Sequence, residues 1–202
     1  MAQHQELAGR NAHQDQGEME VTGFDVPTAI AALRTSLEGN RDEWELWMPE
    51  IPGGSAPQDI PDGLPPGLAA LLAASDGMHL AASTRLFGVD ELASRQLPDH
   101  LVGAKLPDGG ELADASDFFF FGEAADNPLL VNGADGSVWR VPDDGVVWYT
   151  GCRLERIAGS LDAFVSEWIL TPERFLDLAG LTPAEAADSD WYRLLDLSGL
   201  AS

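Results

Sequence analysis

The chain is poor in the residues that most often form cross-links or carry out catalysis. Its 202 residues include one cysteine, Cys152, and one lysine, Lys105. A single cysteine excludes an internal disulfide framework and favours a reducing cytoplasm. Zinc sites need several Cys or His ligands at regular spacing, and this spacing is absent. Schiff-base chemistry has one poor candidate, because Lys105 lies in a predicted loop.

Long apolar runs are also missing, since no stretch approaches the roughly 20 residues that a helix needs to cross a bilayer. The first twenty residues lack the basic and then apolar pattern of a secretory signal. Their Gln, His and acidic content predicts a disordered polar leader over residues 1–20. We therefore expect a soluble, cytoplasmic protein that makes no membrane contact.

Positive charge is scarce throughout. Lys and Arg number 11 against 34 Asp and Glu, which gives a formal charge of −23. Sixteen of the acidic residues fall in 1–100 and 18 in 101–202, so the charge belongs to the whole body of the protein and not to a tail. Such a surface disfavours nucleic acids and anionic membranes and speeds encounter with basic partners. An acidic proteome or a need for solubility would explain the same charge.

The first part of the chain predicts two helices joined by a long loop. A helix that begins after Asp25 carries Val26 and three further apolar residues on one face, and Gly39 is expected to end it in a left-handed conformation. A Pro/Gly-rich loop follows. Pro66 favours the first turn of a second helix, which Gly77 is expected to close.

From residue 78 the pattern changes to short strands, interrupted by a polar, irregular excursion over 93–116. A continuous run of phenylalanines predicts a central strand covered on both faces. Asp-Gly and Pro-Asp turns between apolar runs predict hairpins. The expected strands are Met78–Leu80, Thr84–Phe87, Phe118–Phe121, Leu129–Asn132, Ser137–Val141, Val146–Thr150 and Leu154–Ile157. Together they predict a mostly antiparallel meander.

Helices return after residue 159. Ser160 is a candidate cap for an amphipathic helix that should lie across the sheet. Two further helix starts follow, at Thr171-Pro172 and at the capping box Thr182–Glu185, and they predict a C-terminal helical pair. The fold class that results is α+β, a central antiparallel sheet flanked by helices, with additional helices at the C-terminal side. The stripe of the amphipathic helix is Leu161, Phe164, Val165, Trp168 and Ile169.

A search for catalytic or ligand motifs yields no catalytic, cofactor-binding or metal-binding assignment. Cys152 adjoins Arg153, but no base accompanies it. The Gly-rich turn over 132–136 lacks the ligand spacing of an EF-hand, and no phosphate-binding loop is present. Asp188 and Asp190 could form a metal pair, although charges beside a helix are normally solvated. A glycosidase-type carboxylate pair stays open, because chance pairs are common among 34 acidic residues.

Two tryptophans, Trp139 and Trp148, lie on neighbouring predicted strands. Core packing or a cross-strand pair is the simpler interpretation of both. If one is exposed, a tryptophan ringed by acidic turns would make a good anchor for a basic protein, because aromatic residues dominate interface hot spots.

The order of elements resembles the SUKH superfamily over about residues 26–170, and within it the bacterial immunity proteins related to the yeast cell-wall-synthesis regulators. Each motif by itself reflects only the general pattern of a helix, a turn or a core strand. The resemblance therefore rests on the order of the motifs along the chain. The motifs are Leu64-Pro65 with Leu68, Leu71 and Leu72 leading to Ser75-Asp76-Gly77; Leu86-Phe87 before a short element that ends at Leu92; Phe121-Gly122-Glu123; the hairpin 129–132 to 138–141; and 157–161 with Phe164.

This resemblance implies a SUKH-like domain over 21–170 and a helical extension over 171–202 packed on it. The excursion over 93–116 and that extension depart from a minimal family member. The family implies no catalytic residues and no cofactor. It implies a role in polymorphic toxin systems, in which such proteins bind a cognate toxin, often a nuclease, and protect the producing cell. The acidic surface fits this role, because nucleases present basic grooves to phosphates.

Three hypotheses follow. The first is an immunity protein that neutralises a basic toxin stoichiometrically through its acidic loops. The second is a non-catalytic scaffold or regulatory adaptor of the same superfamily. The third is an enzyme that acts on a small substrate with paired carboxylates. For the first, the candidate contact residues are Asp126, Asp135, Asp143, Asp144, Trp148 and Tyr149. The sequence gives no indication of the oligomeric state.

Overall fold

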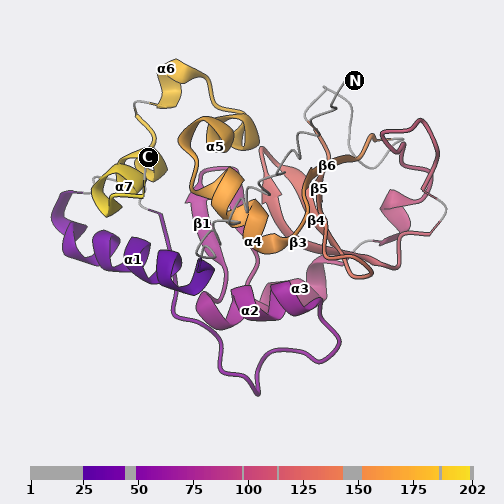
Figure 1. Cartoon of the computed structure of the whole chain (residues 1–202), viewed down its shortest axis with the longest axis horizontal. Helices are drawn as coiled ribbons and strands as arrows, with labels where there is room; N and C mark the ends of the chain where they lie inside the picture. Colours follow the sequence, from indigo (N-terminus) through magenta and orange to yellow (C-terminus); the bar gives the residue numbers. More distant parts are fainter. Residues whose placement is uncertain are drawn as a thin grey trace, which may run out of the picture.

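A computed structural model describes residues 25–43, 49–96, 98–112, 114–142, 152–186 and 188–200. In these ranges the chain forms a six-stranded sheet with the order β1-β2-β3-β4-β5-β6, and every neighbouring pair is antiparallel. Each strand therefore pairs with the next one along the chain. Helices flank this meander, as Figure 1 shows, and the predicted α+β class is confirmed.

The strands follow the apolar runs of the sequence closely. β3 is the longest and pairs with β2 on one side and β4 on the other. Phe121 in its middle is fully buried, as expected for a central strand covered on both faces. The predicted strand over 146–150 lies outside the described residues. The strands are β1 (Met78–Ala81), β2 (Thr84–Leu86), β3 (Phe118–Ala124), β4 (Asn127–Asn132), β5 (Val138–Arg140) and β6 (Glu155–Ala158).

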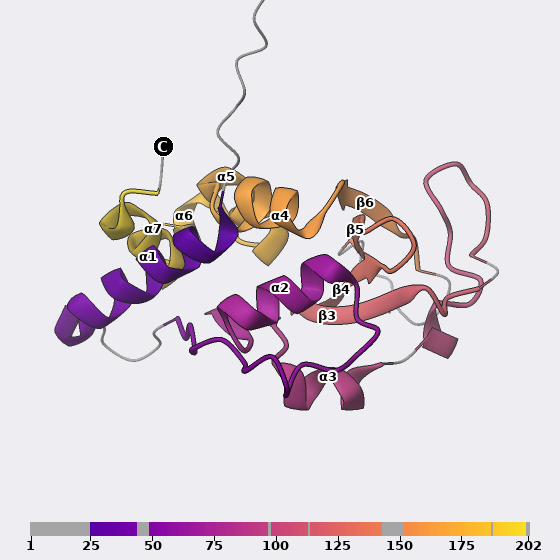
Figure 2. The same ribbon diagram turned by 60° about the horizontal axis from the view of Figure 1, so that its bottom comes forward.

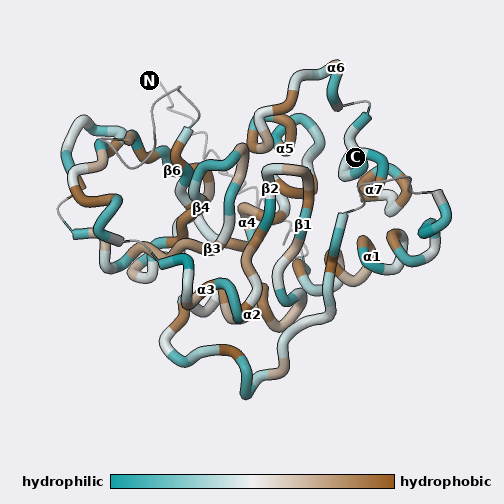
Figure 3. The backbone as a smooth tube through the Cα atoms, turned by 180° about the vertical axis from the view of Figure 1, so that it is seen from behind, coloured by the Kyte–Doolittle hydropathy of each residue, from teal (hydrophilic) through white to brown (hydrophobic). Residues whose placement is uncertain are grey.

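The helices that come before the sheet are α1 (Val26–Gly39), the short 3-10 helix η1 (Arg41–Glu43) and α2 (Pro66–Ala74). Asp25 caps α1 by accepting a hydrogen bond from the Thr28 amide at 3.1 Å. The four predicted apolar residues of α1 are buried, and Figure 3 shows hydrophobic and hydrophilic residues alternating along this helix. The predicted left-handed stop at Gly39 is wrong. Gly39 is the last helical residue, and Asn40 ends α1 with φ −114°.

The segment after β2 differs from the sequence interpretation. The short element expected between Phe87 and Leu92 is the helix α3 (Val89–Arg95), which reaches into the predicted irregular excursion and is followed by the 3-10 helix η2 (Pro98–Leu101). The Asp76 carboxylate accepts a hydrogen bond from the Val89 amide at 2.8 Å. A side chain thirteen positions earlier thus satisfies an amide in the first turn of α3. Such a tertiary cap leaves no local signal in the sequence.

The amphipathic helix predicted after Ser160 is confirmed. It consists of α4 (Leu161–Phe164) and a π-helical turn η3 (Val165–Ile169), and all five residues of its stripe are buried. Ser160 caps it by accepting from the Ala163 amide. The rings of Phe164 and Phe121 meet edge to face, with centroids 5.6 Å apart. This contact fixes α4 across β3. Figure 2 shows α4 and α3 on opposite sides of the sheet.

The C-terminal part contains three helices in place of the predicted pair: α5 (Pro172–Ala179), α6 (Pro183–Ala186) and α7 (Asp190–Ser198). The capping box opens only the single turn α6, and α7 begins separately. Trp191 of α7 is fully buried, donates from Nε1 to the Ile169 carbonyl at 2.9 Å and stacks at a tilt on Phe175. These contacts join α7 to the central core, where it packs on α1 and reaches β1. The division at residue 170 stays a prediction.

The excursion is more ordered than its polar sequence suggests. Lys105 forms an isolated antiparallel bridge with Glu111 and a parallel bridge with Arg153, just before β6. The Lys105 amide donates to the Cys152 carbonyl at 2.8 Å. This loop projects at the right of Figure 1. Across the described ranges, no helix is both long enough and apolar enough to cross a membrane.

Candidate functional site

The structure separates two of the predicted contact residues. Asp126 lies in the turn between β3 and β4, and Asp135 lies in the turn between β4 and β5. Six residues of extended strand stand between the two turns, which places them roughly 20 Å apart at opposite ends of β4. The other four predicted contact residues lie outside the described residues. They are Asp143, Asp144, Trp148 and Tyr149.

Asp135 has a local structural task. Its carboxylate accepts hydrogen bonds from the hydroxyl and the amide of Ser137, and the hydroxyl contributes most to holding the Asp135 pKa below its ordinary value. Gly136 in the same turn has φ +72°, the left-handed region that glycine adopts without strain. The interpretation of this Asp-Gly pair as turn chemistry is confirmed.

Trp139 is also structural, as the simpler interpretation predicted. It faces Leu130 on β4, and its ring meets Phe118 edge to face with centroids 5.9 Å apart. Its Nε1 donates to the Ser137 hydroxyl at 2.8 Å. Cys152 is buried, so its thiol is not presented to a substrate.

Asp126 occupies a strained turn. Ala125 and Asp126 have φ values of 49° and 61°. In this left-handed region the conformational energy of a residue with a Cβ is higher by roughly 1–2 kcal/mol. The Asp126 amide donates to the Ser83 carbonyl in the turn between β1 and β2, at 3.2 Å. The two hairpin turns are thus joined, and the exposed Asp126 stands next to the β1–β2 turn.

A groove of about 360 Å³ opens beside that turn. It lies between β1 and the chain that links α5, α6 and α7, and we call it the β1 groove. Its floor is aliphatic. The floor residues are Leu80, Ala81 and Ala82 from β1 and its turn, and Leu181 from the connection after α5. Among them Ala82 is exposed and Leu80 is buried.

The lining residues from α6 to the start of α7 include three acids, Glu185, Asp188 and Asp190, which we call the acidic wall. Glu185 belongs to the capping box: its carboxylate accepts from the amide of Thr182 at 2.8 Å and from the Thr182 hydroxyl at 2.7 Å. The backbone bond is the larger cause, and together these bonds lower the pKa of Glu185. This carboxyl is therefore ionised at neutral pH.

The opposite wall is the outer edge of β1. His79 lines the β1 groove, and its backbone amide and carbonyl both pair with Glu50 at 2.9 Å. Glu50 thereby covers the edge of the sheet at this position. An exposed strand edge invites pairing with another chain, and a short covering segment reduces that hazard.

Sequence reasoning did not select the residues of the acidic wall as contacts. Asp188 and Asp190 were weighed as a metal pair, and the described residues hold no cluster of three or more ligating side chains. The capping box did place Glu185 at a predicted helix start, and Asp188 and Asp190 were expected beside a helix. The contact between α7 and β1 is tertiary and cannot be read from the sequence. This contact brings the acidic wall next to the aliphatic residues of the β1 groove.

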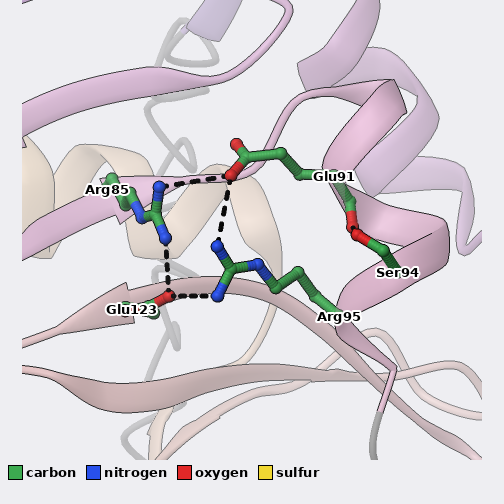
Figure 4. Close-up of polar contacts among 5 residues, drawn as sticks. All are labelled: Arg85, Glu91, Ser94, Arg95 and Glu123. Carbon is green, nitrogen blue, oxygen red and sulfur yellow. Dashed lines mark hydrogen bonds and ion pairs between the residues drawn. The ribbon is translucent and has the colours of Figure 1, made fainter.

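The face of the sheet that carries α3 shows a different arrangement of charge (Figure 4). Arg85 pairs with Glu91 at 3.2 Å and with Glu123 at 3.0 Å, and Arg95 pairs with the same two carboxylates at 3.7 and 3.4 Å. We call these four residues the arginine–glutamate ring. Both guanidinium groups lie 5.4 Å from the ring centroid of the buried Phe87.

Other basic side chains are bound within the molecule as well. The Arg34 guanidinium donates to the carbonyls of Ile51 at 2.9 Å and Ala74 at 2.8 Å. Arg140 pairs with two carboxylates at 2.9 and 3.0 Å and lies 5.0 Å from the centre of the Trp168 ring system. These arginines stabilise the fold, and the 34 acidic residues of the chain outnumber its 11 basic residues.

No protein-family model matches the chain, and no curated protein matches it either. The resemblance to the SUKH superfamily accordingly rests on the order of motifs along the sequence.

Proposed function

We propose that the chain is an immunity protein of the SUKH superfamily that binds and neutralises a cognate basic toxin, such as a nuclease. Inhibition is stoichiometric and requires no catalysis by the chain. The order of the sequence motifs and the α+β meander with its flanking helices support this proposal.

The observation that carries it is the distribution of charge. The chain has 34 acidic and 11 basic residues, and Arg34, Arg85 and Arg140 are each bound to carbonyls or carboxylates. The excess negative charge is left to act on other molecules. Such a field steers a basic protein into contact and raises its association rate. A toxin that binds nucleic acid carries the complementary surface.

The decisive experiment uses the product of any toxin gene that lies beside the gene for this chain. The two proteins are mixed, the complex is measured by calorimetry at 50 and 500 mM NaCl, and toxin activity is titrated. We expect a 1:1 complex, full inhibition at equivalence and an affinity at least about tenfold weaker at high salt. No complex with that toxin or its close relatives would refute the proposal.

The same titration separates the scaffold or adaptor hypothesis from this one. An adaptor would also bind a basic partner with salt sensitivity, but it would leave the partner's activity intact. A pull-down that returns a cellular complex and no toxin would favour the adaptor.

The enzyme hypothesis requires a carboxyl group that holds its proton near neutral pH, as a general acid does. In the β1 groove, hydrogen bonds from Thr182 move the pKa of Glu185 in the opposite direction. An ionised carboxylate in this place is suited to binding a cation.

A further inference from the structure

We propose that the β1 groove receives a lysine or arginine side chain of the protein partner. The aliphatic stem of that side chain lies on the groove floor, and its charged end meets the acidic wall. This inference rests on the proposed function, because it takes the partner to be a basic protein.

The size of the β1 groove limits what can enter it. A volume of about 360 Å³ stands near the lower end of the roughly 300–1,000 Å³ range of ligand pockets. It accommodates one or two side chains from a partner surface and excludes a folded element. The groove is therefore suited to an anchor residue, the kind of contact that contributes most to an interface.

The chemistry of the two surfaces selects the occupant. Ala81, Ala82 and Leu181 offer no hydrogen-bonding side chain, so the part of the occupant that touches them must be apolar. In the acidic wall, Glu185 and Asp188 repel anions and attract a cation. Lys and Arg combine an aliphatic stem with a cationic end and routinely bury the stem along apolar surface.

The β1 groove is also held in shape before a partner arrives. Trp191 anchors α7 to the carbonyl of Ile169, and the bond from the Asp126 amide to Ser83 ties the β1–β2 turn to its neighbour. A prearranged site loses little conformational entropy on binding. The exposed carboxylate of Asp126 adds negative charge beside the groove, so one of the residues expected from sequence contributes to the same surface.

A partner-free titration tests the groove directly. The full chain, labelled with ¹⁵N, is titrated to 10 mM with the capped pentapeptide Gly-Leu-Lys-Leu-Gly, and with versions carrying arginine or norleucine in place of lysine. We expect saturating amide shifts at Ala81, Ala82 and Ser189 for the lysine and arginine peptides only. Shifts that do not saturate at these residues, or that are equal with norleucine, would overturn the inference.

Matched variants then test the groove in the complex. Ala82→Arg places bulk and positive charge at an exposed groove residue, and Ala134→Arg makes the same change in the β4–β5 turn at the far end of the sheet. We expect Ala82→Arg to weaken toxin binding at least about 30-fold and Ala134→Arg less than about threefold. Asp188→Asn should weaken it about five- to tenfold, against no change for Asp59→Asn in the exposed loop before α2.

The outcomes separate the two proposals. If the toxin does not bind the wild-type chain, the proposed function fails, and the peptide titration still decides whether the groove accepts a basic side chain. If the toxin binds wild type and Ala82→Arg equally well, the groove assignment fails while the function stands. Thermal unfolding of each variant shows whether a loss of binding comes from loss of the fold.

Discussion

The arginine–glutamate ring and the β1 groove handle charge in opposite ways. In the ring, two arginines and two glutamates pair at 3.0 to 3.7 Å, and both cations rest near Phe87. In the groove, three carboxylates line one wall, and the sole basic side chain among the lining residues is His79. In the ring every charge has an opposite charge beside it, whereas Glu185 and Asp188 offer the groove a negative charge that another molecule can neutralise.

This difference explains how an acidic protein can use its few arginines. A half-buried arginine close to carboxylates holds elements together, as Arg85 does for β2, β3 and α3. The same arginine near the groove would cancel the charge that attracts a basic partner. Stability and binding are thus assigned to separate faces, so substitutions in the ring and at the exposed groove residues should affect one without the other.

The largest expected effect comes from removing the anchor that holds the groove wall. Trp191→Ala deletes a fully buried ring and its hydrogen bond to Ile169, which should cost about 3–5 kcal/mol of unfolding free energy. Leu197→Ala on the same helix, at a side chain 40% exposed, should cost under about 0.5 kcal/mol. Urea unfolding measures both. Equal small losses would show that α7 does not depend on Trp191.

Breaking the ring should lower stability and spare binding. Glu123→Lys replaces a shared carboxylate with a third cation beside Arg85 and Arg95, and the side chain is 26% exposed, so a loss of about 1–2 kcal/mol is expected. Glu123→Gln should lose about half as much. Urea unfolding gives the stability and calorimetry the toxin affinity. A large drop in affinity with Glu123→Gln would contradict the separation of the two faces.

A stabilising change is expected in the turn beside the groove. Ala125 has φ 49°, and Ala125→Gly removes the clash of its Cβ in the left-handed region. Glycine also raises the entropy of the unfolded chain, so the net gain should be up to about 1 kcal/mol. The measurement is the shift in thermal midpoint. A lower midpoint would mean that the Ala125 side chain makes contacts worth more than the strain.

The smallest effect is expected from Asp135, far from the groove. Its pKa is lowered in the folded chain, so its ionised form contributes stability above the ordinary Asp value of about 3.9 and loses it as pH falls through the folded value. Asp135→Asn should therefore cost about 0.5 kcal/mol at pH 7 and less below pH 3. Unfolding free energies at the two pH values check this. A cost that grows on acidification would contradict the sign.

The sequence predicted the fold well wherever periodicity or a cap was local. The phenylalanine run of β3, the stripe after Ser160 and the capping box at Thr182 all behave as their patterns indicate. The start of α3 was missed because its cap, Asp76, comes from an earlier turn. The helix follows directly on the strand expected over Thr84–Phe87 and runs into the segment that was predicted to be irregular.

The candidate site was predicted only in part. Asp126 was chosen for its charge and does stand beside the groove, while Asp135 was chosen for the same reason and lies at the other end of β4. The charge of a residue is written in the sequence, but its neighbours across the fold are not. Asp188 and Asp190 acquire their place from the packing of α7 on α1 and β1.

That packing also has a consequence for the order in which the protein matures on the ribosome. Every strand of the meander pairs with the one just before it, so the sheet can assemble progressively as the chain emerges. The helix α1 emerges first among the described helices and packs on α2 as well as on α7, and α7 follows the sheet by many residues. Without residues 181–190 the groove has its β1 side and no acidic wall. A chain interrupted before residue 181 would therefore carry all six described strands yet be unable to capture a basic side chain, so competence to bind would arrive only after the sheet is complete.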